Sequence, residues 1–160
     1  SAREIGTYDK KPEMRAPEIT DKAVEAIRSG RYPLIVMNYA NPDMVGHTGK
    51  WTAIIAALDV VDECLGRLEK AALESDSILL ITADHGNAEE KIDLATGKEL
   101  TAHTCNPVPF IALSAEPKLK LAAGGKLADV APSICQLLEL PPPAVMTGHS
   151  LLAQSADVTG

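Results

Sequence analysis

The chain has 160 residues, of which 46% are hydrophobic, so it is long and apolar enough for one ordinary domain and not typical of a disordered chain. Its net charge of −7, without a basic stripe, argues against a general nucleic-acid-binding protein. No apolar run approaches the roughly 20 residues of a membrane-spanning helix, and the first residues show no signal-peptide pattern. We therefore expect no nucleic-acid or membrane partner.

The cysteines indicate the redox environment. Cys64, Cys105 and Cys135 are odd in number, lie far apart and form no C-x-x-C motif. This usage predicts a reduced, cytoplasmic chain with cysteines that are inert core or loop residues.

The first quarter of the chain predicts a lead-in, a helix and a strand. Residues 1–16 are irregular, and residues 17–29 have a helical pattern that starts with Pro17 and stops at Gly30. Residues 33–39 are an apolar run that predicts a buried strand.

The second quarter predicts a polar loop over residues 40–49 and a long helix over residues 50–74. Apolar residues recur at intervals of three and four along that helix, which predicts one core-facing side. The members of this side are Trp51, Ile54, Ile55, Leu58, Val61, Leu65, Leu68 and Ala72. The charged residues between them are interpreted as a solvated face.

The second half predicts two more strands and a helix. Residues 78–82 predict a buried parallel strand, and residues 110–114 predict a third strand. Between them, residues 88–101 predict a polar hairpin that turns at Thr96-Gly97. Residues 129–138 predict a helix that ends before Pro141. This order predicts an α/β fold with a mainly parallel sheet and helices on both faces.

Histidines and aspartates lie in loops at the ends of the predicted strands. His47 comes four residues after Asp43, His85 is adjacent to Asp84, and His103 precedes the third strand. Because ligands bind at the carboxyl ends of strands in open α/β sheets, we expect these five side chains to converge there. Imidazoles and carboxylates without a thiolate suit Mn²⁺, Zn²⁺ or Mg²⁺, and five ligands suit two ions better than one.

Simpler interpretations remain open. Asp43 and Asp84 are also typical turn or capping residues, and a lone His103 is more often a structural hydrogen-bonding residue. His149, in Thr-Gly-His-Ser, is interpreted as a surface or turn residue.

Several longer motifs resemble those of the cofactor-independent (2,3-bisphosphoglycerate-independent) phosphoglycerate mutase family, within the alkaline phosphatase superfamily. They include Asn-Tyr-Ala-Asn-Pro-Asp-Met-Val-Gly-His-Thr-Gly and Ile-Thr-Ala-Asp-His-Gly-Asn-Ala-Glu. The matching segments span residues 7–14, 38–49, 61–66, 81–89, 101–109 and 146–151, so the resemblance covers nearly the whole chain.

The resemblance implies a three-layer, alkaline-phosphatase-like fold and roles for the five residues. It implies that Asp43, His47 and His103 hold one Mn²⁺, with Co²⁺ as another possible ion, and that Asp84 and His85 help to hold a second. It also implies a serine nucleophile that transfers phosphate between the 3- and 2-hydroxyls of glycerate through a phosphoserine, as a step of glycolysis.

The chain departs from the family in length. Family members are much longer, and their nucleophilic serine, a further metal-binding aspartate and an inserted transferase-like domain have no counterpart here. The serines that do not match are Ser29, Ser75, Ser77, Ser114, Ser133 and Ser150. We therefore expect residues 1–160 to be the C-terminal portion of the phosphatase domain, monomeric, inactive alone, and completed by the N-terminal part of the same enzyme.

Two other hypotheses stay open. The chain could belong to another metal-dependent phosphatase or phosphomutase of the superfamily, or it could be a non-catalytic metal-binding fragment.

Weak binding is expected for the second ion, because Asp84 and His85 supply only two ligands.

Overall fold

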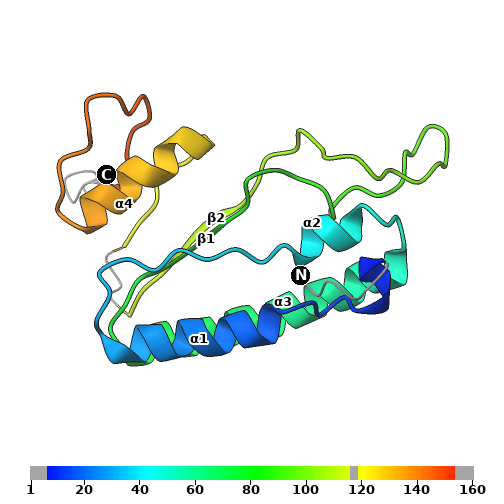
Figure 1. Cartoon of the computed structure of the whole chain (residues 1–160). Helices are drawn as coiled ribbons and strands as arrows, with labels where there is room; N and C mark the ends of the chain where they lie inside the picture. The colour runs from blue at the N-terminus through cyan, green and yellow to red at the C-terminus, as the bar shows by residue number, and fades with distance from the viewer. Residues whose placement is uncertain (1–6, 116–118, 154–160) are drawn as a thin grey trace.

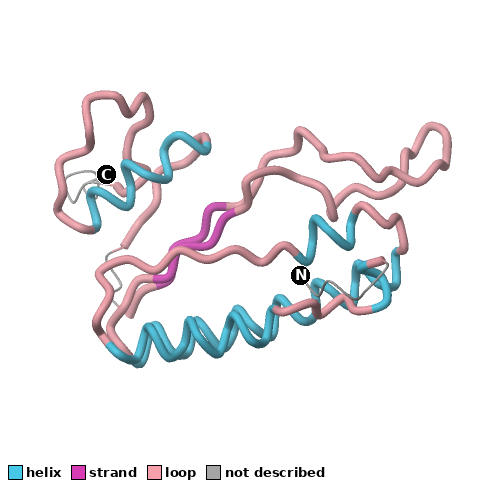
Figure 2. Tube along the Cα trace, viewed as in Figure 1, coloured by secondary structure: helices cyan, strands magenta, loops and turns pink. Residues whose placement is uncertain are grey.

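The computed structural model describes residues 7–115 and 119–153, and long loops join its helices and strands (Figure 2). The helices are α1 (Ala16–Ser29), α2 (Asn41–Gly46), α3 (Trp51–Glu74) and α4 (Val130–Leu137). The strands are β1 (Leu79–Thr82) and β2 (Phe110–Leu113), and two short 3₁₀ turns are η1 (Tyr8–Lys10) and η2 (Leu127–Asp129). No helix in these described ranges is long and apolar enough to cross a membrane.

Helices α1 and α3 lie side by side for most of their length, as Figure 1 shows. Both were predicted within one or two residues of their observed bounds, and α1 ends at Gly30 as expected. Arg28 pairs with Glu74 at 3.0 Å across the two helices, and Arg67 pairs with Asp21. These pairs are exposed, so the contact owes more to apolar packing than to charge.

The buried side of α3 is narrower than predicted. Ile54 and Leu68 are buried as expected, whereas Trp51 is 54% exposed and Ile55 is 40% exposed. Small residues, such as Ala57 and Cys64, make up much of the buried side. Helices α1 and α2 cover one side of α3, and the side that contains Trp51, Ile55 and Leu58 is left exposed to solvent.

A small core lies where α3 meets the short helix α2. It contains Met14, Val45, Ala53, Ile54 and Ala57, with Tyr8 of η1 packed against it. Ile54 and Val45 are fully buried. This core anchors α2, which contains the predicted site residue Asp43 and is followed directly by His47.

The sheet differs from the predicted one. Strands β1 and β2 are antiparallel, with Leu79 opposite Leu113 and Thr82 opposite Phe110, so the prediction of parallel neighbours is wrong for this pair. Parallel neighbours need a crossover, usually a helix, and the connection over residues 83–109 contains none among its described elements. Strand β1 is half-buried instead of fully buried, since the sheet has two strands in the described ranges.

The strand predicted at residues 33–39 is also not formed. This segment is drawn as an extended loop in Figures 1 and 2 and does not join the described sheet. Leu34 and Val36 are 48% and 80% exposed. An apolar strand needs a paired neighbour to bury both its backbone and its side chains, and no described strand supplies one here.

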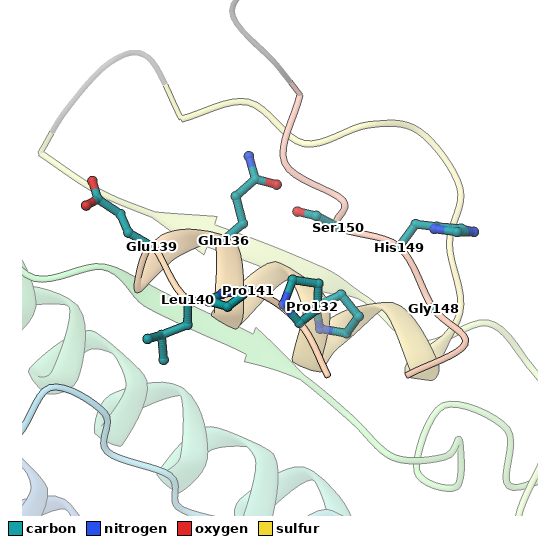
Figure 3. Close-up of a pocket in the computed structure, with 9 residues that line it drawn as sticks. Pro132, Gln136, Glu139, Leu140, Pro141, Gly148, His149 and Ser150 are labelled. Carbon is teal, nitrogen blue, oxygen red and sulfur yellow. The ribbon is translucent and has the colours of Figure 1, made fainter. Parts of the chain in front are cut away.

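The last described part of the chain folds back onto α4, which lies across the strands from α1 and α3 (Figure 1). Asp129 accepts hydrogen bonds from the backbone N–H groups of Lys126 and His149, both at 2.9 Å. Ser133 accepts one from the Leu151 N–H at 2.8 Å. A hollow of about 590 Å³ between α4 and residues 148–150 is lined by Pro132, Gln136, Leu140 and His149 (Figure 3).

Candidate metal centre

Helix α2 positions Asp43 and His47, in a segment that was predicted as a loop. That prediction is wrong because Pro42 suits the first turn of a helix, where the Asp43 carboxylate also meets the positive end of the helix dipole. A helix brings residues four apart to the same side, and His47 Nε2 lies 3.2 Å from Asp43 Oδ1.

His85 and His103 come from the two ends of the long connection between β1 and β2. Gly86 and Thr104 form an antiparallel bridge, in which the Thr104 N–H donates to the Gly86 carbonyl at 2.9 Å. A Cβ on residue 86 would lie 2.1 Å from Thr104 Oγ1, so only glycine allows the two arms to approach this closely. The bridge places the two imidazoles face to face.

Asp43, His47, His85 and His103 form what we call the histidine–aspartate cluster. His103 Nε2 lies 3.0 Å from Asp43 Oδ1 and 3.1 Å from His47 Nε2. The rings of His85 and His103 stack with centroids 3.7 Å apart at 18°. One donor atom from each of Asp43, His85 and His103 falls within 4.8 Å of the others.

Two neighbours orient the cluster, and neither was assigned a role from the sequence. His47 Nδ1 lies 2.6 Å from the Thr101 carbonyl oxygen, which can only accept, so Nδ1 carries a proton and Nε2 faces the cluster. The Asn87 amide donates to Asp43 Oδ1 at 2.6 Å. The sequence gives no sign of which backbone carbonyl will contact a side chain. Asn87 could have been considered from the sequence, because it lies two residues after His85.

Asp43 is ionised at neutral pH. Partial burial raises the pKa of its carboxyl, but the hydrogen bond from Asn87 and the charges of His47, His103 and His85 together lower that pKa below its ordinary value. The cluster therefore offers a carboxylate and imidazole nitrogens at one point.

Asp84 lies at the margin of the cluster. Its side chain is 82% exposed, and its Oδ1 is 3.7 Å from His85 Nε2. Asp84 is not in the close group formed by Asp43, His85 and His103. The structure thus brings four of the five predicted residues together and leaves Asp84 beside them.

The donor set fits a divalent cation. His47 and His103 offer Nε2, His85 offers a ring nitrogen and Asp43 offers a carboxylate oxygen. The second nitrogen of His47 is held by a carbonyl, as is usual for metal-binding histidines. His149 has no part in this group. It lines the hollow beside α4, which contains none of the predicted ligands (Figure 3).

Known proteins are similar to this chain in sequence and in fold. A model of the Metalloenzyme superfamily matches residues 1–142. The chain is 53% identical over 148 residues to the 2,3-bisphosphoglycerate-independent phosphoglycerate mutase of Clostridium botulinum (strain Langeland / NCTC 10281 / Type F), covering 92% of this chain and 29% of that protein. It is 55% identical over 148 residues to the enzyme of the same name from Cellvibrio japonicus (strain Ueda107), covering 92% of this chain and 28% of that protein.

A solved structure of a phosphoglycerate mutase is also similar to this chain. Leishmania mexicana phosphoglycerate mutase, determined at low cobalt concentration, superposes with a TM-score of 0.83 at 33% identity and covers 92% of this chain and 30% of that protein. The likeness confirms the predicted fold class as part of an α/β domain. The chain spans less than a third of the length of these curated relatives. Because the superfamily model matches 142 consecutive residues, the chain belongs to the Metalloenzyme superfamily.

Proposed function

We propose that this chain is the metal-binding, C-terminal portion of the phosphatase domain of a cofactor-independent phosphoglycerate mutase. The observation that carries the proposal is the histidine–aspartate cluster, in a chain more than half identical to enzymes of that name. The reaction of the whole enzyme would convert 3-phosphoglycerate into 2-phosphoglycerate in the cytoplasm, as an intramolecular phosphotransfer.

The chain's own residues would bind and orient two divalent ions. Asp43, His47 and His103 would hold one, and Asp84 with His85 would hold part of the other, with Mn²⁺ as the proposed ion and Co²⁺, Zn²⁺ or Mg²⁺ as substitutes. The chemistry that such ions supply is neutralisation of phosphoryl oxygens and activation of a hydroxyl nucleophile. The Thr101 carbonyl keeps the proton of His47 on Nδ1 and so presents Nε2 to the ion.

The nucleophile and the remaining ligands would come from the rest of the enzyme. The Ser133 hydroxyl donates a hydrogen bond to the Asp129 carbonyl, and the Ser29 hydroxyl donates one to the Ala26 carbonyl, so both hydroxyl protons are engaged by the local backbone. The exposed apolar residues of segment 32–36 are consistent with a surface that the N-terminal part of the same enzyme covers.

The test is an assay of the longer enzyme that contains this chain. Conversion of 3-phosphoglycerate should require a divalent ion, and Asp43→Asn should lower kcat/KM by about 100-fold or more, because the carboxylate would be lost from the ion. Asp59→Asn, on the exposed side of α3, is the matched control and should leave kcat/KM unchanged. No conversion by the metal-loaded enzyme would show that the proposed function is wrong.

A further inference from the structure

A buried lysine lies behind the histidine–aspartate cluster, in a position that the proposed reaction does not use. Lys91 is 3% exposed and Asn87 is 4% exposed. Lys91 Nζ donates a hydrogen bond to Asn87 Oδ1, and Asn87 Nδ2 donates to Asp43 Oδ1 at 2.6 Å and to the Asp43 carbonyl oxygen at 3.3 Å. These contacts form a continuous line from Lys91 through Asn87 to Asp43.

The donor and acceptor properties of Lys91, Asn87 and Asp43 fix the orientation of the Asn87 amide. An amide side chain has an accepting end and a donating end, a lysine ammonium only donates, and an ionised carboxylate only accepts. Lys91 therefore holds the oxygen of Asn87 toward itself and turns the NH₂ group toward Asp43. If the amide were reversed, its oxygen would face the carboxylate and its NH₂ would face the ammonium.

The surroundings leave the amide little room to move. A Cβ added at Gly46 of α2 would lie 2.8 Å from Asn87 Oδ1 and 3.0 Å from its Cγ, so the amide packs directly on the helix backbone. The Asn87 N–H donates to Glu89 Oε2 at 2.7 Å, and Glu89 is bonded in turn to Thr104. Asn87 is thus held by both arms of the loop that carries His85 and His103.

Lys91 also connects to the arm that orients His47. The Lys91 carbonyl accepts from the Leu100 N–H at 2.9 Å, and Leu100 precedes Thr101, whose carbonyl oxygen lies 2.6 Å from His47 Nδ1. The backbone and the side chain of Lys91 therefore support two different cluster residues.

We propose that Asn87 and Lys91 are positioning residues, which hold the Asp43 carboxylate in the orientation that binds a divalent cation. The proposal rests on the proposed metal centre and assigns a role to two residues outside it. Neither residue belongs to the proposed donor set. Lys91 acts through Asn87, and Asn87 acts through Asp43.

The test exploits the sign of the charge changes. Lys91→Met removes a positive charge near the centre and Asn87→Asp adds a negative one, so charge alone would make both variants bind a cation more tightly. We call the hydrogen-bonded line from Lys91 through Asn87 to Asp43 the relay. If the relay positions the Asp43 carboxylate, both variants should instead bind the cation more weakly, because each variant breaks this line. Co²⁺ titration of the full chain, followed by calorimetry and by visible absorption, should show a Kd raised about tenfold or more for both variants.

Two comparisons separate positioning from other effects. Lys98→Met removes the same charge from an exposed residue of the same β1–β2 connection and should not weaken Co²⁺ binding. In an Asn87→Ala background, Lys91→Met should cause no further loss, because Lys91 acts through the missing amide. A full second loss in the double variant would contradict the relay.

A measurement on the unaltered chain covers the case in which variants misfold. The Asn87 side-chain amide should exchange with solvent much more slowly in NMR than that of the exposed Asn38. Equal exchange rates, or variants that bind Co²⁺ as well as or better than the wild type, would overturn the relay and leave the metal centre intact. A wild-type chain that binds no Co²⁺ would overturn the metal centre and the relay with it.

Discussion

Both ring nitrogens of His47 have a defined contact in the site. Its Nε2 faces Asp43 and His103, and its Nδ1 is held by the Thr101 carbonyl. The spacing of Asp43 and His47, and the presence of His85 and His103 near predicted strand ends, were enough to predict that these residues meet. The Thr101 contact and the exposed position of Asp84 could not be predicted, because both depend on loop geometry that residue types do not encode.

His47→Ala should weaken binding of Mn²⁺ or Co²⁺ sharply, because it removes one of three ligands from the proposed first site. We expect at most one tightly bound ion per chain, measured by elemental analysis and calorimetry. His149→Ala is the matched control, since His149 lies beside α4 and outside the cluster (Figure 3). Equal effects of the two substitutions, or two equally tight sites, would contradict the assignment.

Asp129 makes a prediction about acid stability. Hydrogen bonds from the backbone N–H groups of His149 and Lys126 lower the pKa of its carboxyl in the folded chain. A carboxyl with a depressed folded pKa stabilises the fold at any pH above its unfolded pKa, about 3.9, and this stabilisation is lost as the pH falls through the folded pKa.

Asp129→Asn should therefore lower the thermal unfolding temperature at pH 7 and reduce its dependence on pH below about 4. Circular dichroism melts of both proteins between pH 7 and pH 2 would test this. An unfolding temperature that falls as steeply with acid in the variant as in the wild type would argue against the role of Asp129.

Among the helices, α2 is the one that was not predicted from the sequence. Asn41, Pro42 and Gly46 are typical of loops, and six residues are too few for a periodic apolar pattern. The long helices α1 and α3 were predictable because their patterns extend over many turns. The sheet was less predictable, since an apolar run indicates a strand but not the direction of its neighbour or whether one is present.

Ile54 and Ile55 of α3 form a natural pair of opposite environments. Ile54 is fully buried in the core next to α2, whereas Ile55 is 40% exposed. Ile54→Ala should reduce the free energy of unfolding by about 2–5 kcal/mol through lost burial and the cavity left behind. Ile55→Ala should reduce that free energy by clearly less, about 1 kcal/mol, because part of this side chain already faces solvent. Urea unfolding of the isolated chain measures both values, and similar losses would mean that α3 packs on a different side.

At the scale of the whole molecule, the described chain exposes two apolar surfaces. Segment 32–36 and the stripe of α3 that contains Ile55 and Leu58 are apolar and accessible. The sequence predicted burial for both, because an apolar run is typical of a buried strand and an apolar helical stripe is typical of a core-facing helix. The proposed partner is the N-terminal part of the same enzyme, which would supply the missing neighbours.

The isolated chain should not convert 3-phosphoglycerate into 2-phosphoglycerate, even when it is loaded with Mn²⁺. The proposed nucleophilic serine lies outside it, and a metal centre alone cannot carry the phosphate through a covalent intermediate. A coupled assay with the purified 160-residue chain, compared with a blank, tests this directly. Turnover above the blank would show that a group within this chain replaces that serine.

Trp51 is the single tryptophan of the chain and begins α3, four residues after His47, with its side chain 54% exposed. Its fluorescence should therefore show the red-shifted emission of a hydrated indole in the isolated chain. If the rest of the enzyme covers this end of α3, the emission should move to shorter wavelength and become less accessible to acrylamide. The residue would then serve as a built-in optical probe of domain assembly, with no added label.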